Sequence, residues 1–142
     1  MSQFRVDQID HVELFVPDRR VAAAWYERTL GLTVAAEYEH WADNPAGPLM
    51  ITTPGGGTKL ALFTGEPQRD RPNVGIYLIA FRVSRAGFDA FLAHIRDNPV
   101  FDERSQEVRE LVVRDHGAAL SVYFRDPYGH RLEVTTYDVA KL

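Results

Sequence analysis

The chain has 142 residues, a formal net charge of -4 at pH 7 and a hydrophobic content of 45%. This length suits one domain or two small, closely packed halves, and the composition argues against a disordered chain. The absence of cysteine excludes a disulfide framework, a thiolate metal site and a cysteine nucleophile. The first residues do not resemble a signal peptide, no apolar run reaches the about 20 residues of a membrane helix, and no basic block is present. We therefore expect a cytoplasmic protein without a nucleic-acid or membrane partner.

Apolar periodicity divides the chain into two halves. The first half is expected to contain a strand at residues 8–16, followed by a helix that Asp18 caps and Gly31 ends. Three further strands are expected at residues 32–38, 49–53 and 59–64. The segment 65–75 is polar and contains prolines, which is typical of a linker.

The second half repeats the same order of elements. It is expected to contain a strand at residues 76–83, a helix that Ser84 caps, and strands at residues 107–114, 120–125 and 131–137. We therefore predict an α+β fold of two βαβββ modules, residues 1–64 and 76–142, whose mixed sheets curve around a cleft with the helices outside. The alternative is an α+β domain with two helices and no internal duplication.

The strand faces that the helices do not cover indicate where a ligand would bind. Each helix must cover the apolar face of its own sheet, so alternation assigns the remaining side chains to the opposite face. On that face the first, seventh and eighth strands carry a mixture of polar and aromatic residues: His11, Glu13, Phe15, Ser121, Tyr123, Arg125, Arg131, Glu133, Thr135 and Tyr137. A cleft lined in this way is typical of a small-molecule site.

The last turn predicts a specific pairing of side chains. Residues 126–129, Asp-Pro-Tyr-Gly, have the proline and the glycine of a type I turn. If Gly129 is left-handed, the two last strands pair so that Tyr123 lies across from Glu133. A phenol would then lie beside a carboxylate.

Two segments resemble the vicinal oxygen chelate superfamily, which contains glyoxalases, bleomycin-resistance proteins and extradiol dioxygenases. The first is IDHVELFVPD at residues 9–18, with Trp25-Tyr26 and Leu30-Gly31-Leu32 after it. The second is SVYFRDPYGHRLEV at residues 121–134. The resemblance covers nearly the whole chain and implies the paired-module fold.

The resemblance also implies a divalent metal, with ligands from the first and last strands of each module. The four corresponding positions are His11, Ala61, Leu78 and Glu133, and only His11 and Glu133 carry side chains that coordinate metals. An Fe, Mn, Zn or Ni ion would have an incomplete ligand set here, unless Glu13 or Tyr123 joins it. In extradiol dioxygenases a tyrosine at the place of Tyr123 acts as an acid or a hydrogen-bond donor.

Each of these residues also has a structural interpretation. His11 could be a polar residue on a solvated strand, Glu133 a salt-bridged glutamate, and Trp41 a packing residue. His116 and His130 are expected in turns, where exposed histidines are common.

Three functions remain open. The first is a metal-dependent lyase, isomerase or ring-cleaving oxygenase, in which His11 and Glu133 hold the metal while Tyr123 and Glu133 are catalytic. The second is a metal-free protein of the bleomycin-resistance type that binds or sequesters a flat compound. The third is a structural or regulatory module without a ligand. The first is slightly favoured, a homodimer is expected, and the pocket residues would be Glu13, Phe15, Trp41, Ser121, Arg125 and Tyr137.

Overall fold

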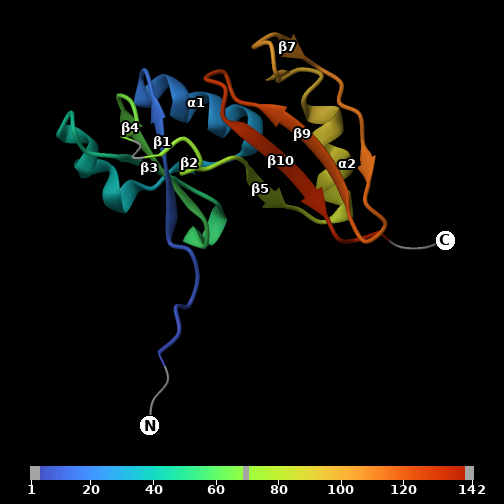
Figure 1. The fold of residues 1–142 in the computed structure, drawn as a ribbon, viewed down its shortest axis with the longest axis horizontal. Coiled ribbons are helices and arrows are strands. Elements are labelled where there is room, and N and C mark those ends of the chain that lie inside the picture. Colours follow the sequence, from blue (N-terminus) through green and yellow to red (C-terminus); the bar gives the residue numbers. More distant parts are fainter. Residues whose placement is uncertain (1–3, 69–70, 140–142) are drawn as a thin grey trace. The chain divides into compact units, whose positions relative to one another are not determined.

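The computed structural model describes residues 4–68 and 71–139. The chain divides into two compact units, Met1–Gln68 and Arg69–Leu142, each of which contains a mixed sheet and an α-helix that packs on it (Figure 1). Residues 69 and 70 of the expected linker lie outside the described residues. No helix in the described part of the chain is long and apolar enough to cross a membrane.

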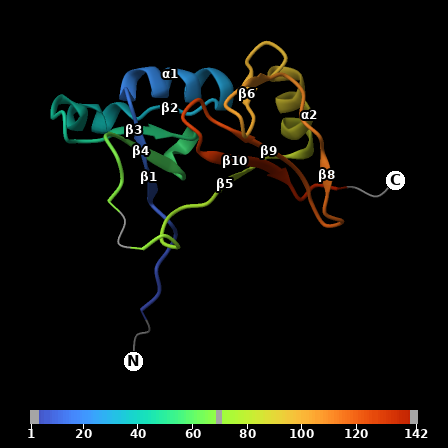
Figure 2. The same ribbon diagram turned by 45° about the horizontal axis from the view of Figure 1, so that its top comes forward.

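The first unit has the element order that its sequence predicts. Its strands are arranged in the order β1-β4-β3-β2, with β1 parallel to β4 and the other pairs antiparallel. Helix α1 packs on β3 and β4 (Figure 2). The elements are β1 His11–Val16, α1 Arg19–Leu30, β2 Thr33–Val34, the 3-10 helix η1 Ala36–Asp43, β3 Leu49–Thr52, the 3-10 helix η2 Pro54–Gly56 and β4 Lys59–Thr64.

The limits of α1 follow from the predicted capping residues. The Asp18 side chain accepts hydrogen bonds from the backbone amides of Arg20 and Val21. At the other end, Gly31 has a φ of 73°, which is the left-handed conformation that glycine adopts without strain. The core of the unit lies between α1 and the sheet and includes Leu14, Val16, Trp25, Tyr26, Leu49, Ile51, Leu60 and Leu62.

The prediction of a strand at residues 32–38 is wrong beyond Val34. Pairing with β3 stops after two residues, and the chain turns into η1. Arg19 explains this turn, because its guanidinium donates to the backbone carbonyls of Ala42, Asn44 and Gly47. A segment tethered to the start of α1 in this way does not continue along the sheet.

The second unit repeats the arrangement and extends it. Its strands are arranged in the order β5-β10-β9-β6-β7, and β8 also pairs with β9. The predicted cap of α2 is confirmed, since the Ser84 hydroxyl accepts the Gly87 amide. The elements are β5 Ile79–Arg82, α2 Arg85–His94, β6 Val100–Phe101, β7 Glu107–Val108, β8 Arg114–Asp115, β9 Leu120–Arg125 and β10 Arg131–Thr136.

The single strand predicted at residues 107–114 is also wrong. Only its two ends form strands, β7 and β8. The place beside β9 is shared by β6, which pairs at Arg125, and β8, which pairs at Leu120 and Ser121. Asp102 accounts for the difference, because its carboxylate accepts the amides of Arg104 and Gln106 and closes a tight β6–β7 hairpin.

The first and last strands pair in the same register in both units. Glu13 lies opposite Ala61 in the parallel β1–β4 pair, and Ala80 lies opposite Glu133 in the parallel β5–β10 pair. The common order of strand, helix and three strands, together with this register, confirms the predicted α+β fold of two βαβββ modules. Strands β7 and β8 are additions to the second module.

Candidate functional site

The outer face of β1 carries the polar residues that the alternation predicts. Leu14 and Val16 are buried, whereas His11 and Glu13 are exposed and Phe15 is half-buried. The register with β4 adds Lys59 opposite His11 and Phe63 opposite Phe15. This face therefore has a charged end at His11 and an aromatic end at Phe15, where the rings of Phe15 and Phe63 stack at 5.8 Å.

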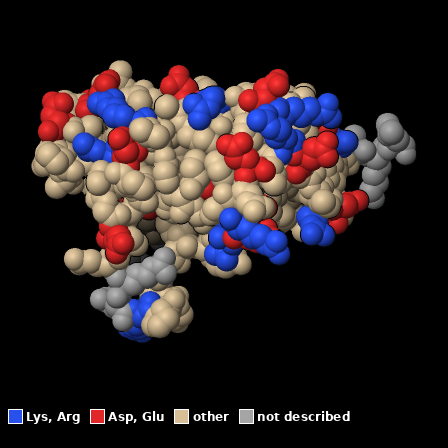
Figure 3. Space-filling model, turned by 90° about the horizontal axis from the view of Figure 1, so that it is seen from above, with Lys and Arg blue, Asp and Glu red and all other residues tan. Residues whose placement is uncertain are grey.

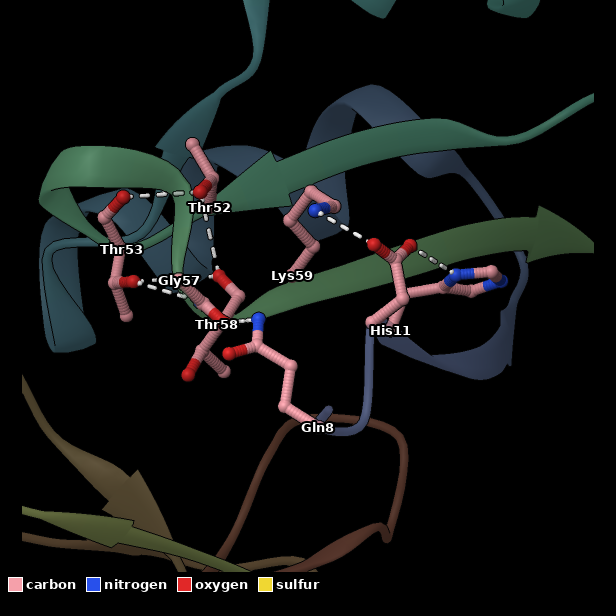
Figure 4. A network of polar contacts seen from close by, with 8 residues as sticks. Gln8, His11, Thr52, Thr53, Gly57, Thr58 and Lys59 are labelled. Atoms are coloured by element: carbon pink, nitrogen blue, oxygen red, sulfur yellow. Dashed lines mark hydrogen bonds and ion pairs between the residues drawn. The ribbon is translucent and has the colours of Figure 1, made fainter. Parts of the chain in front are cut away.

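The charged end is a chain of contacts in which Asp10 lies between His11 and Lys59, two of the residues labelled in Figure 4. His11 Nδ1 lies 2.9 Å from Asp10 Oδ2, and Lys59 Nζ lies 3.1 Å from Asp10 Oδ1. On the other side of the imidazole, Nε2 lies 3.4 Å from Glu13 Oε2. Gln8 lies close by and donates to the carbonyl of Gly57.

These contacts shift two ionisation equilibria in opposite directions. The hydrogen bond to Asp10, assisted by Glu13, raises the pKa of His11 above its usual value. The hydrogen bonds to His11 and Lys59 lower the pKa of Asp10. The arrangement therefore favours a protonated imidazole beside two carboxylates.

A pocket of about 170 Å³ lies between this charged end and η1. The rings of Tyr38 and Trp41 in η1 stack with their centroids 4.7 Å apart, and Trp41 is 42% exposed. Beneath them, Met50 and Ala61 form a buried cluster with Ala35. The pocket is lined by Asp10, His11, Glu13, Tyr38, Trp41, Pro48, Met50, Lys59, Ala61 and Phe63.

The second unit brings Tyr123 and Glu133 together as predicted. The two residues are direct partners in the antiparallel β9–β10 pair, and Gly129 in the connecting turn has a φ of 96°. The structure adds a partner that sequence reasoning did not identify, because His116 Nε2 lies 2.9 Å from the Tyr123 hydroxyl. The pairing of β8 with β9 produces this contact by bringing the turn that contains His116 back over β9.

The other expected pocket residues of the second unit lie in different environments. Arg125 and Tyr123 line an open pocket of about 630 Å³. Tyr137 lies over the Arg82 guanidinium at 5.4 Å. Ser121 is buried and its hydroxyl lies 2.9 Å from that of Thr135, so it lines neither of the pockets above.

The fit of these residues to a metal ion is partial. Within residues 4–68 and 71–139, no group of three or more His, Asp or Glu side chains is placed to hold an ion. The expected ligands belong to different units, His11 to the first and Glu133 to the second. His11 has one feature of a metal ligand, the contact of Nδ1 with Asp10, but its Nε2 already lies 3.4 Å from Glu13 Oε2.

The charged side chains do not form a single-sign field on the face drawn in Figure 3. Lysine and arginine side chains are interspersed there with aspartate and glutamate side chains. An electrostatic footprint for nucleic acid would require a basic stripe.

Comparison with known proteins adds to this geometry. The family model of the glyoxalase/bleomycin resistance protein/dioxygenase superfamily matches residues 8–134. No protein with a curated description matches the sequence. The expected resemblance is therefore confirmed at the level of the superfamily.

Several solved structures have a similar fold. An integron cassette protein from the mobile metagenome of V. cholerae is 26% identical, with 96% of this chain and 99% of that chain covered and a TM-score of 0.65. The oxidase ChaP-H2 is 25% identical, with 93% and 94% covered and a TM-score of 0.64. A lactoylglutathione lyase from Agrobacterium tumefaciens is 20% identical, with 96% and 98% covered and a TM-score of 0.64, a likeness that concerns the fold alone.

Proposed function

The chain belongs to the glyoxalase/bleomycin resistance protein/dioxygenase superfamily, and we propose that it binds a small, flat molecule in the pocket of its first unit. The observation that carries this proposal is the partly exposed Trp41 ring, which is stacked on Tyr38 and forms one wall of the pocket. An exposed indole that is already held in place offers a stacking surface at little entropic cost. The volume of about 170 Å³ is below that of sites for drug-sized ligands, about 300–1,000 Å³. A compound of about one ring is therefore the expected ligand class.

The charged end of the pocket would orient such a compound. Lys59 donates to Asp10, and the protonated His11 donates to Asp10 and Glu13, so this end offers both donor groups and carboxylate acceptors. A ring with two adjacent oxygens, such as catechol, presents both donors and acceptors to this end. The third function suggested by the sequence, a module without a ligand, does not account for a pocket with this composition.

Catechol binding tests the proposal. Equilibrium dialysis should show saturable binding to the wild type, and Trp41→Leu should weaken it about three- to tenfold through the loss of stacking. His40→Leu is the matched control, because His40 neighbours Trp41 in η1 without lining the pocket. Equal binding by the wild type and Trp41→Leu would contradict the proposal.

A second candidate function is a metal-dependent lyase, isomerase or ring-cleaving oxygenase. It is favoured by one observation, the hydrogen bond between His11 Nδ1 and Asp10, which holds the ring with Nε2 on the side of Glu13, so that both groups would face the same ion. In this function His11 and Glu133 would hold a divalent ion, which when bound polarises vicinal oxygens of a substrate. Tyr123 would donate or accept a proton at its hydroxyl, with His116 Nε2 as the hydrogen-bond partner and Glu133 across the strand pair.

Metal analysis separates the two functions. Protein purified without chelator should contain stoichiometric metal in the second function, and both His11→Ala and Glu133→Ala should lose it. His40→Ala, which removes an exposed histidine elsewhere, should keep the metal. A wild type without metal that still binds catechol would leave only the first function. The homodimer and the cytoplasmic location stay predictions, and light scattering of the purified chain tests the dimer.

A further inference from the structure

The open pocket of the second unit contains an arrangement of charge that the fold alone does not explain. Arg125 at the end of β9 and Arg131 at the start of β10 are direct partners in the antiparallel pair. Like charges at directly opposed positions destabilise a sheet.

No carboxylate in the described part of the chain neutralises these arginines. The ion pairs formed within residues 4–68 and 71–139 involve Arg20, Arg85, Lys59, His11 and His130, but neither Arg125 nor Arg131. Arg114, which lines the same pocket, is in none of them either. Three guanidinium groups around one pocket are therefore available to an external anion.

Aromatic rings complete the lining. The Arg131 guanidinium lies 4.3 Å from the ring centroid of Tyr77, a cation–π contact that holds the guanidinium beside the pocket. Tyr123 and Phe101 line the same pocket, whose volume of about 630 Å³ admits a ring together with a charged group.

The pocket also contains acidic residues, which restrict where an anion can lie. Asp102 uses Oδ1 to accept the amides of its own hairpin, whereas Glu103 and Glu110 are exposed on the lining. An anion is therefore favoured at the Arg125–Arg131 pair and disfavoured near Glu103 and Glu110.

We propose that the Arg125–Arg131 pair is a binding site for the oxyanion group, carboxylate or phosphoryl, of a small aromatic compound. Guanidinium groups bind both oxyanions in bidentate fashion, and the bound anion would cancel the repulsion between the paired arginines. The site lies within the second unit, so the proposal goes beyond the proposed function and does not depend on the Trp41 pocket.

Nuclear magnetic resonance titration of the full chain tests the proposal, because the Nε–Hε signals of arginine report directly on the guanidinium groups. Benzoate and phenyl phosphate are the two oxyanion probes, and benzyl alcohol is the neutral control. Saturable shifts of the Arg125 and Arg131 signals are expected with at least one oxyanion and not with benzyl alcohol. The probe that binds more tightly identifies the group.

Arg125→Gln and Arg131→Gln should each weaken oxyanion binding about tenfold, as expected for the loss of a hydrogen bond to a charged group. Arg85→Gln, on α2 of the same unit, removes the same charge and should leave binding unchanged. Without a probe, Arg125→Gln should unfold at or above the wild-type temperature, because it removes the like-charge contact and keeps the contact of Arg131 with Tyr77. Equal shifts with benzoate, phenyl phosphate and benzyl alcohol, or wild-type affinity in both arginine variants, would overturn the proposal. These readouts come from the second unit, so they are independent of catechol binding at Trp41.

Discussion

His11 lies between two carboxylates, and its charge therefore depends on its neighbours. The protonated ring donates to Asp10 through Nδ1 and to Glu13 through Nε2, which raises its pKa, chiefly through Asp10. A group with a raised folded-state pKa stabilises the fold fully below its unfolded-state pKa of about 6.5. That stabilisation is lost as the pH rises through the folded-state value.

Replacement of Asp10 tests this coupling. Asp10→Asn should lower the pKa of His11, because the neutral amide stabilises the imidazolium less than the carboxylate does. The wild type should also lose more stability than the variant as the pH rises from below about 6.5. Imidazole proton shifts followed against pH in metal-free protein give the pKa, and Asp7→Asn controls for the change in net charge. An unchanged pKa of His11 in Asp10→Asn would contradict the assignment.

Asp126 has a structural role in the turn before β10. Its side chain is fully buried, Oδ1 accepts the amides of Tyr128 and His130, and Oδ2 lies 2.6 Å from His130 Nδ1. Asp126→Ala should therefore lower the free energy of unfolding by about 2–3 kcal/mol, since three half-buried donor groups would lose their acceptor. Urea denaturation measures this loss. Asp115→Ala removes an exposed turn carboxylate that accepts the Gly117 amide, and it should cost clearly less.

The η1 segment depends on a close approach of two backbone stretches. A Cβ atom at Gly47 would lie within 2.3 Å of the Trp41 carbonyl oxygen, which is a backbone atom that cannot rotate away. Gly47→Ala should therefore displace η1, weaken catechol binding and change the Trp41 fluorescence. Gly57→Ala is the matched control, because it has a negative φ and open space around its Cβ position. Unchanged fluorescence and binding in Gly47→Ala would show that η1 is not displaced and would contradict the prediction.

The elements that were predicted correctly from the sequence are those whose limits depend on residues close together in the chain. The Asp18 and Ser84 caps, the left-handed Gly31 and the strands β4 and β9 follow from residue types within a few positions of each other. The segments predicted wrongly depend on distant contacts: η1 on the carbonyls that bind Arg19, and the divided strand at residues 107–114 on the Asp102 hairpin.

For the candidate sites, too, the features that depend on nearby residues were predicted and those that depend on distant contacts were not. Alternation predicted the face shared by His11 and Glu13, and turn chemistry predicted the Tyr123–Glu133 pair. The Asp10–Lys59 contact and the His116–Tyr123 contact were not predicted, because they require the β1–β4 and β8–β9 pairings respectively. Spacing in the sequence carries no signal for such contacts.

Across the whole molecule, the repeated register relates the four expected metal positions to one another. Ala61 is paired with Glu13 of β1, and Glu133 is paired with Ala80 of β5. Glu13 and Ala80 occupy equivalent positions in the first strands of the two units, so Ala61 corresponds to Glu133. Ala61 is fully buried in the cluster with Ala35 and Met50, beneath Tyr38 and Phe63. Ala61 also lines the pocket, and a carboxylate there would replace a small apolar side chain packed against Ala35 and Met50.

Leu78 is different, because it is only half-buried and has room for a polar side chain. It lies two residues before Ala80, the direct partner of Glu133, and therefore on the same strand face as that carboxylate. Leu78→His should place an imidazole diagonally beside Glu133 and raise the affinity for Ni²⁺ about tenfold or more, because a further nitrogen ligand joins the carboxylate. Competition with a chromophoric chelator measures the affinity. Leu92→His is the control, because it adds a histidine on α2, outside this strand face, and should leave the affinity at the wild-type value. An equal gain in affinity in both variants would mean that Glu133 takes no part in binding the metal.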